Sequence, residues 1–268
     1  MRLGLLGVAA LLVLAALGLV MLAAPLLPLH DPGEVDLANS YAPPSADHPL
    51  GTDANGRDLL ARLVWGSRTA LLGPLLVTAV ATTVGVALAM AAAWRGGWLD
   101  AVTARAFDIG FAFPGILLAL VVAAVMGAGL GAAVVALAVA FVPSVGRVTR
   151  GSALQQLRLP YVDALRVQGQ SPAAICARHL LPNLGALVVA QATLTFGYAL
   201  VDLAALSYLG LGADPATPDW GVMVAAGQAD ILGGRPQQSL CAGALIVVAV
   251  AACCVLGERV TDHGGRRG

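Results

Sequence analysis

Residues 69–93 read TALLGPLLVTAVATTVGVALAMAAA, a stretch of 25 residues without a charged side chain. A helix of this length, rising 1.5 Å per residue, crosses about 30 Å of hydrocarbon, so the stretch predicts a membrane-spanning helix. The rest of the chain has the same character, because 59% of its 268 residues are apolar and 11% are charged. Soluble domains carry about 25% charged residues. The composition therefore excludes an ordinary soluble enzyme and predicts a multi-pass membrane protein.

Five further apolar segments flank this one, and together they predict an all-α fold with six transmembrane helices. The predicted spans are residues 3–27, 69–93, 107–126, 129–145, 184–211 and 239–256. They divide the chain into an N-terminal helix (1–27), an external loop (28–68), a transmembrane domain (69–262) and a short tail (263–268). A cleaved signal peptide is the alternative for the first segment. Its apolar run exceeds the usual 7–15 residues, which favours a retained helix.

The arginines set the predicted orientation. With the N-terminus inside, eleven arginines lie in internal segments and four in external ones, as the positive-inside rule requires. The internal ones are Arg2, Arg95, Arg105, Arg147, Arg150, Arg158, Arg166, Arg178, Arg259, Arg266 and Arg267, and the external ones are Arg57, Arg62, Arg68 and Arg235. Both termini are therefore expected in the cytoplasm.

The external loop changes character along its length. Five prolines between residues 25 and 44 exclude a continuous helix there. Leu59, Leu60 and Leu63 then recur at helical spacing, with Asp58 and Arg62 among them. This pattern predicts an amphipathic helix just before the second span.

The internal segment 147–182 is the most polar stretch on the cytoplasmic side. Pro160 suits the first position of a helix, and Gly169 can adopt the left-handed conformation that ends one. Ser171 then fits an N-cap, with Pro172 at the first position of a second helix. The sequence predicts two short helices joined by a glycine turn. An ordinary cytoplasmic hairpin is the plainer interpretation.

The spacing in this loop resembles the cytoplasmic "EAA" loop of binding-protein-dependent ABC importer permeases. The family pattern is Glu-Ala-Ala, three residues, Gly, nine residues and then Ile-x-Leu-Pro. The matching positions here are Asp163, Ala164, Leu165, Gly169, His179, Leu181 and Pro182. Asp replaces Glu, Leu replaces the second Ala and Gln168 precedes the glycine, which are three departures from the pattern.

Other segments narrow the resemblance to dipeptide, oligopeptide and nickel importer permeases, of the second-subunit type. Residues 50–58 read LGTDANGRD, and residues 207–212 read SYLGLG, followed by PDWGVM at 218–223. Both are similar to segments typical of these permeases, as are Gly96-Gly97-Trp98 with Asp100, and Ala112-Phe113-Pro114. The resemblance covers residues 49–262 in the family's order.

The resemblance implies a permease subunit of the bacterial inner membrane that is not itself an enzyme. The implied partners are a second homologous permease, two cytoplasmic ATP-binding subunits and a periplasmic or lipid-anchored solute-binding protein. ATP and Mg²⁺ are expected on the ATPases, with no cofactor on this chain. In agreement, the chain has no lysine, which excludes a P-loop. Its formal net charge of zero speaks against nucleic acid. The implied cargo is a peptide or nickel.

One polar stripe stands out in the fifth span. Gln191, Thr195, Tyr198 and Asp202 lie within about 60° of one another around a helix. A charged carboxylate deep in a span costs at least about 2.5–3.5 kcal/mol, so Asp202 should face a cavity or a partner. A pathway-lining face and a contact between the two permeases both fit this spacing.

Other chemistries find little support. The four histidines and four cysteines show no metal-ligand spacing, so no metal site is expected. A membrane-embedded hydrolase lacks a nucleophile–base constellation. The alternative function is a secondary transporter or channel that works without an ATPase, although no internal repeat supports it.

Overall fold

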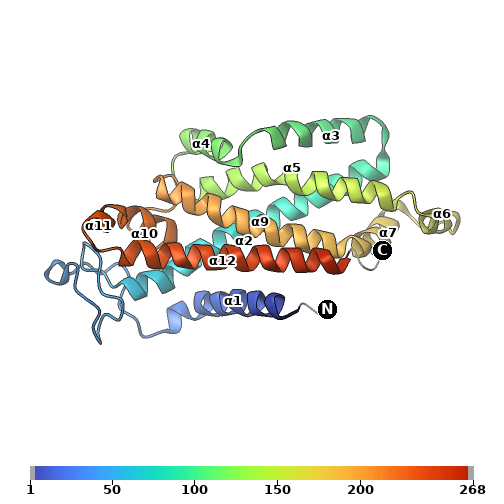
Figure 1. Cartoon of the computed structure of the whole chain (residues 1–268). Helices are drawn as coiled ribbons and strands as arrows, with labels where there is room; N and C mark the ends of the chain where they lie inside the picture. Colours follow the sequence, from blue (N-terminus) through green and yellow to red (C-terminus); the bar gives the residue numbers. More distant parts are fainter. Residues whose placement is uncertain (1–3, 265–268) are drawn as a thin grey trace.

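The structure, a computed structural model, describes residues 4–264, and within them it is helical without a β-strand (Figure 1). The long helices are α1 (Gly4–Ala23), α2 (Leu59–Arg95), α3 (Gly97–Ala112), α4 (Gly115–Met126), α5 (Leu130–Gln156), α9 (Gly185–Tyr208) and α12 (Gln237–Gly264). The short ones are η1 (Ala24–Leu26), η2 (Leu37–Asn39), α6 (Pro160–Val167), α7 (Pro172–Ile175), η3 (Cys176–Leu180), α8 (Leu181–Asn183), α10 (Trp220–Ala226) and α11 (Gln228–Leu232). Arg2, Leu3, Arg266 and Arg267, used above for the first span and the orientation, lie outside the described residues.

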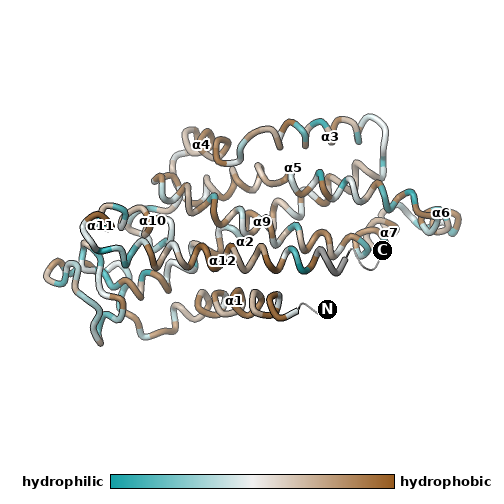
Figure 2. The backbone as a smooth tube through the Cα atoms, viewed as in Figure 1, coloured by the Kyte–Doolittle hydropathy of each residue, from teal (hydrophilic) through white to brown (hydrophobic). Residues whose placement is uncertain are grey.

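Apolar and polar residues are separated along the long axis of the molecule (Figure 2). The tube is mostly apolar along the long helices, and polar residues gather in the loop 28–68 and in residues 157–184, which are called the coupling loop after the family loop that they resemble. Five helices, α1, α2, α5, α9 and α12, are long and apolar enough to cross a membrane, and the bent pair α3–α4 makes a sixth span if counted as one. Helices suit this environment because every backbone hydrogen bond is made within the segment. The prediction of an all-α, multi-pass membrane protein is confirmed, with five or six candidate spans in the described residues.

Four helices, α2, α5, α9 and α12, form the centre of the bundle. Leu200, Leu203 and Leu206 of α9 are almost fully buried and pack against α2 and its other neighbours. Small residues let the helices approach closely: a Cβ on Gly85 of α2 would lie 3.0 Å from the carbonyl oxygen of Val142. Tight packing at small residues is how helices associate when lipid surrounds them.

The second and fourth spans are longer than predicted. α2 begins at Leu59, so the expected amphipathic helix forms its first turns and is not a separate element. The Asp58 side chain accepts a 2.6 Å hydrogen bond from the Ala61 amide and starts the helix there. α5 continues to Gln156, past the predicted end at residue 145, and in this extension Arg147 and Arg150 pair with Asp108 and Asp100 of α3.

The third span is not the continuous helix predicted over residues 107–126. The chain is helical from Gly97 to Ala112, bends by 86° and resumes as α4 from Gly115 to Met126. The break lies at Phe113 and Pro114, because the residue before a proline is driven into the extended conformation, here φ −93° and ψ 127°. The twelve residues of α4 are about 18 Å long, which is too short to cross a bilayer alone.

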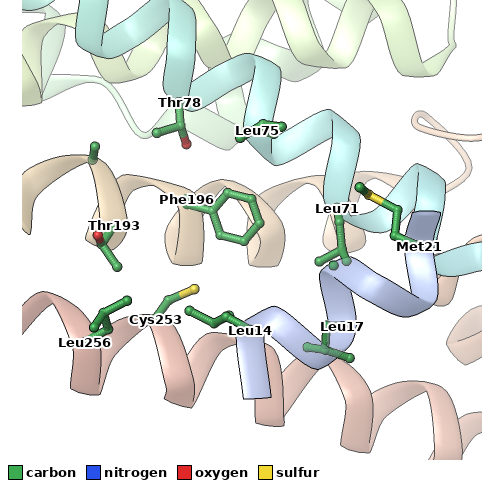
Figure 3. A pocket seen from close by; sticks show the side chains of 12 residues that line it. Leu14, Leu17, Met21, Leu71, Leu75, Thr78, Thr193, Phe196, Cys253 and Leu256 are labelled. Carbon is green, nitrogen blue, oxygen red and sulfur yellow. The ribbon is translucent and has the colours of Figure 1, made fainter. Parts of the chain in front are cut away.

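α1 lies at the edge of the bundle and leaves a gap beside it (Figure 3). A cavity of about 360 Å³ lies between α1, α2, α9 and α12, with Leu17, Leu71, Phe196 and Cys253 among its lining residues. Its walls are almost entirely apolar. Thr78 and Thr193 are the polar residues among those that line it.

Candidate functional site

The coupling loop begins with the helix α6. Leu159 precedes it in an extended conformation, Pro160 occupies its first turn, and Asp163 lies in the same turn. A negative charge there is favourable at the positive end of the helix dipole. Val162 is fully buried against the bundle. Asp163, Ala164 and the 89% exposed Val167 lie on its open side, so α6 presents one face outward.

The predicted glycine turn is confirmed. Gly169 has a φ of +72°, in the left-handed region that favours glycine. The Gln170 amide donates to the Leu165 carbonyl at 3.2 Å, a closure typical of a helix that ends at such a residue. A Cβ on Gly169 would meet no other atom within 4 Å, so the turn is open on its outer side.

The second helix of the loop begins as predicted and then widens. The Ser171 hydroxyl accepts a 3.3 Å hydrogen bond from the Ala174 amide, with Pro172 in the first turn of α7. The chain next forms one π turn, η3, whose closing bond runs from the Leu181 amide to the Cys176 carbonyl. Pro182 follows, and since it has no N–H to donate, the regular α pattern cannot pass through it unchanged.

Side-chain bonds hold the loop in one shape. His179 lies 3.1 Å from the Gln170 side-chain oxygen, which ties η3 back to the turn. The Tyr161 hydroxyl donates to the Gln156 side chain at 3.0 Å and accepts from Asn183 at 3.3 Å. The first and last parts of the coupling loop are thereby fastened to the end of α5.

The coupling loop rests on the C-terminal end of α2. Val162, Ile175 and Leu180 are fully buried and pack against Met90 and Trp94 of that helix. Burial also raises the pKa of the Cys176 thiol, which keeps it protonated at neutral pH. Sequence reasoning did not foresee this attachment, because nothing local marks Met90 or Trp94.

The four residues of the polar stripe on α9 do not share one environment. Thr195 is 1% exposed and faces the bundle, whereas Tyr198 is 58% exposed and Gln191 and Asp202 are half-buried. Asp202 has no hydrogen-bond or ion-pair partner among residues 4–264. Its carboxylate lies beside Gly115, where an added Cβ would be 3.8 Å from Oδ2, so it is close to the first turn of α4.

At the other end of the molecule, two motifs that are far apart in the sequence meet. The fully buried Trp220 indole donates to the Leu63 carbonyl at 2.9 Å, and the Thr69 hydroxyl donates to the Pro218 carbonyl at 2.9 Å. Asp219 caps α10 by accepting from the Gly221 and Val222 amides. The 50–68 and 218–223 segments therefore form one structural unit. Together with residues 28–49, this unit is called the outer cap, after the external position that the arginines predict for it.

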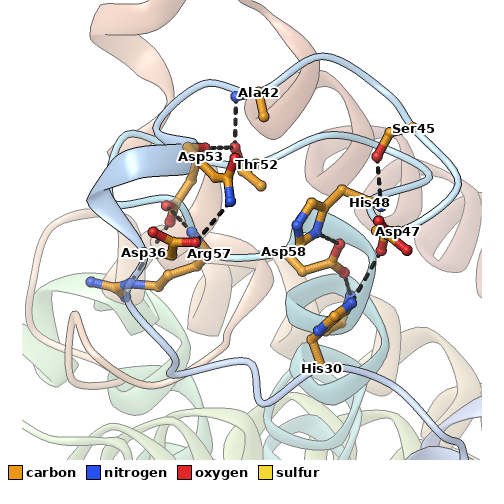
Figure 4. Close-up of polar contacts among 12 residues, drawn as sticks. His30, Asp36, Ala42, Ser45, Asp47, His48, Thr52, Asp53, Arg57 and Asp58 are labelled. Atoms are coloured by element: carbon orange, nitrogen blue, oxygen red, sulfur yellow. Dashed lines mark hydrogen bonds and ion pairs between the residues drawn. The ribbon is translucent and has the colours of Figure 1, made fainter.

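Within the outer cap, charged residues serve mainly to shape the loop (Figure 4). The Asp53 carboxylate accepts from the Asn55 and Arg57 amides, and Asp58 lies 2.9 Å from His48 Nδ1. The Tyr41 hydroxyl donates to Asp230 at 2.6 Å, a hydrogen bond that raises the pKa of Tyr41 and joins the loop to α11. Among the residues that the structure describes, no group of three or more potential ligands could hold a metal ion.

Comparison with known proteins assigns the chain to a family. Residues 81–267 match the family described as binding-protein-dependent transport system inner membrane component. The chain belongs to this family. It is thus a multi-pass membrane permease of an ABC importer, working with other subunits of the transporter, and the predicted family is confirmed.

The chain is similar along almost its full length to permeases from several bacteria. It is 34% identical to the dipeptide transport system permease protein DppC of Alkalihalophilus pseudofirmus, over 96% of this chain and 84% of the relative. It is also 34% identical to the glutathione transport system permease protein GsiD of Pectobacterium atrosepticum, over 95% of this chain and 84% of the relative. The probable D,D-dipeptide transport system permease protein DdpC of Escherichia coli is 34% identical over 91% of this chain and 82% of the relative.

Proposed function

We propose that this permease is one of two transmembrane subunits that form the path of an ATP-driven peptide importer. The observation that carries the proposal is 34% identity to a dipeptide permease over 96% of the chain. The other relatives named above carry glutathione or D,D-dipeptide in their names. Nickel, which the motifs alone left open, is the second cargo to test.

The proposed source of energy is a pair of cytoplasmic ATPases that dock on the coupling loop. The chain has no lysine and thus no P-loop, so ATP and Mg²⁺ are expected on those partners and no cofactor on this chain. α6 supports this role because its inner face is buried and its outer face is open. A short amphipathic helix of this kind fits a groove on a partner. The proposed docking residues are Asp163, Ala164, Leu165, Gly169, His179, Leu181 and Pro182.

The proposed orientation places the coupling loop and both termini in the cytoplasm. In Figure 1 the start of α1 and the end of α12 point toward the end of the bundle that carries α6, and the outer cap lies at the other end. The eleven-to-four division of arginines supports a cap on the outside. A solute-binding protein is expected to deliver cargo to the cap.

The polar stripe of α9 is the proposed lining of the path. Tyr198 is exposed and Asp202 is half-buried without a partner in the described part of the chain, as expected for side chains that face a second subunit or a path between two subunits. Thr195 faces the chain's own bundle, so we propose Gln191, Tyr198 and Asp202 as the residues nearest the cargo. A contact with the second permease is the competing role.

Co-purification tests the proposal directly. The tagged chain is expressed with its neighbouring genes, and an ATPase and a second permease are expected to purify with it. The solute-binding protein from the same genes is then heated with a dipeptide, glutathione or Ni²⁺, and the peptide ligands are expected to raise its melting temperature. Stabilisation by Ni²⁺ alone would assign nickel. Solute flux through the lone purified chain would show a transporter that needs no ATPase.

A further inference from the structure

α2 is long enough to connect the two ends of the molecule. Its 37 residues correspond to about 55 Å, and it remains one helix through Pro74. At its outer end Asp58 caps it, and the buried Arg62 donates to the Pro32 carbonyl at 3.0 Å. At its inner end Met90 and Trp94 contact the coupling loop. α2 therefore touches the outer cap and the coupling loop at once.

Apolar packing and a contact from a charged side chain both attach the coupling loop to the inner end of α2. Val162, Ile175 and Leu180 of the coupling loop are 0% exposed, and side chains packed at this density cannot move independently of their neighbours. The guanidinium carbon of Arg166 lies 5.1 Å from the centre of a Trp94 ring, within the range of a cation–π contact. Arg166 Nη1 also lies 3.1 Å from the Asp163 carboxylate.

These contacts connect the exposed face of α6 to α2, a candidate membrane-spanning helix. Asp163 pairs with Arg166, Arg166 covers Trp94, and Trp94 belongs to α2. A displacement of α6 along the membrane surface would therefore be passed to the inner end of α2. Since the outer end of α2 is bonded to the cap, the displacement would also strain the bond between Arg62 and Pro32.

We propose that α2 carries the ATPase-driven movement of the coupling loop to the outer cap, and that Trp94 is the positioning residue that joins α6 to it. The inference rests on the proposed function, because it takes α6 as the docking helix. It adds that α2 is the span that receives the movement and that Trp94 is the side chain through which α2 receives it.

The test uses the complete transporter in proteoliposomes with its solute-binding protein. Trp94→Ala should leave the ATPase bound and its basal hydrolysis unchanged. Uptake per ATP hydrolysed should fall about tenfold, the factor that corresponds to about 1.4 kcal/mol of lost coupling. Trp94→Phe keeps a ring under Arg166 and should restore most of the uptake. Trp98→Ala is the matched control, because Trp98 is 77% exposed and begins the next helix.

Three results would overturn the inference. Wild-type uptake per ATP in Trp94→Ala would show that another span receives the movement. Loss of the ATPase from Trp94→Ala would show that Trp94 shapes the docking surface instead of transmitting from it. An equal loss of coupling in Trp98→Ala would show a general effect of removing tryptophan. Failure of the proposed function is separate, since then no ATPase purifies with the unmodified chain.

Discussion

Gly169 allows the docking role of the coupling loop to be tested apart from the packing of the chain. Its φ of +72° makes any side chain there strained, by roughly 1 kcal/mol. Apart from its two chain neighbours, no described residue lies within 4 Å of a Cβ at Gly169, so the first side-chain carbon of Gly169→Asp meets no clash in the described part of the subunit. The buried cluster of Val162, Ile175 and Leu180 should hold the two helices of the loop in place despite that strain.

A docked ATPase would make Gly169→Asp costly in binding free energy as well as in backbone strain. If its surface covers the turn, a new side chain driven into that contact costs about 1–3 kcal/mol of binding free energy, whereas the backbone strain is the same in the free and the docked subunit. This penalty corresponds to about 5- to 140-fold weaker association, using about 1.4 kcal/mol per decade. We therefore expect Gly169→Asp to insert normally and to retain the second permease, while losing the ATPase and solute uptake.

The assay is titration of the purified permease pair with the ATPase, alongside uptake in cells. Gly210→Asp is the matched control, because Gly210 has a φ of +77°, equally open surroundings and a place at the outer end of α9. It should carry the same backbone strain and still bind the ATPase. Full ATPase binding and uptake by Gly169→Asp would refute the docking role, and equal loss in both variants would assign the effect to strain.

Three further predictions address the outer cap, the path and the orientation. Trp220→Phe removes the hydrogen bond to the Leu63 carbonyl and should destabilise the purified protein by about 1–3 kcal/mol in thermal unfolding, whereas an unchanged melting temperature would contradict a structural role. Asp202→Ala should impair uptake with the complex intact if Asp202 lines the path, and should lower recovery of the second permease if it is a subunit contact; normal results in both assays would exclude both roles. With the four native cysteines replaced, an impermeant thiol reagent added to intact cells should label a cysteine at Asn55 and spare one at Gln168, and the reverse pattern would invert the topology.

Local features of the coupling loop could be predicted from the sequence, and the structure agrees with them. Pro160 in the first turn, the left-handed Gly169 and the Ser171 cap each depend on backbone geometry within a few residues. Such preferences act wherever the segment lies in the molecule. The π turn before Pro182 was missed, although the proline itself was a visible signal.

The sequence by itself determined the class of protein and the number of apolar segments, because lipid admits only long apolar helices with internally satisfied backbones. Tertiary structure decided what the sequence could not. The contact of Trp220 with Leu63 and the contact of Arg166 with Trp94 both depend on residues brought together by packing. Trp220 and Leu63 are 157 positions apart. No local pattern specifies such a pair, because its energy exists only once the helices around it have assembled.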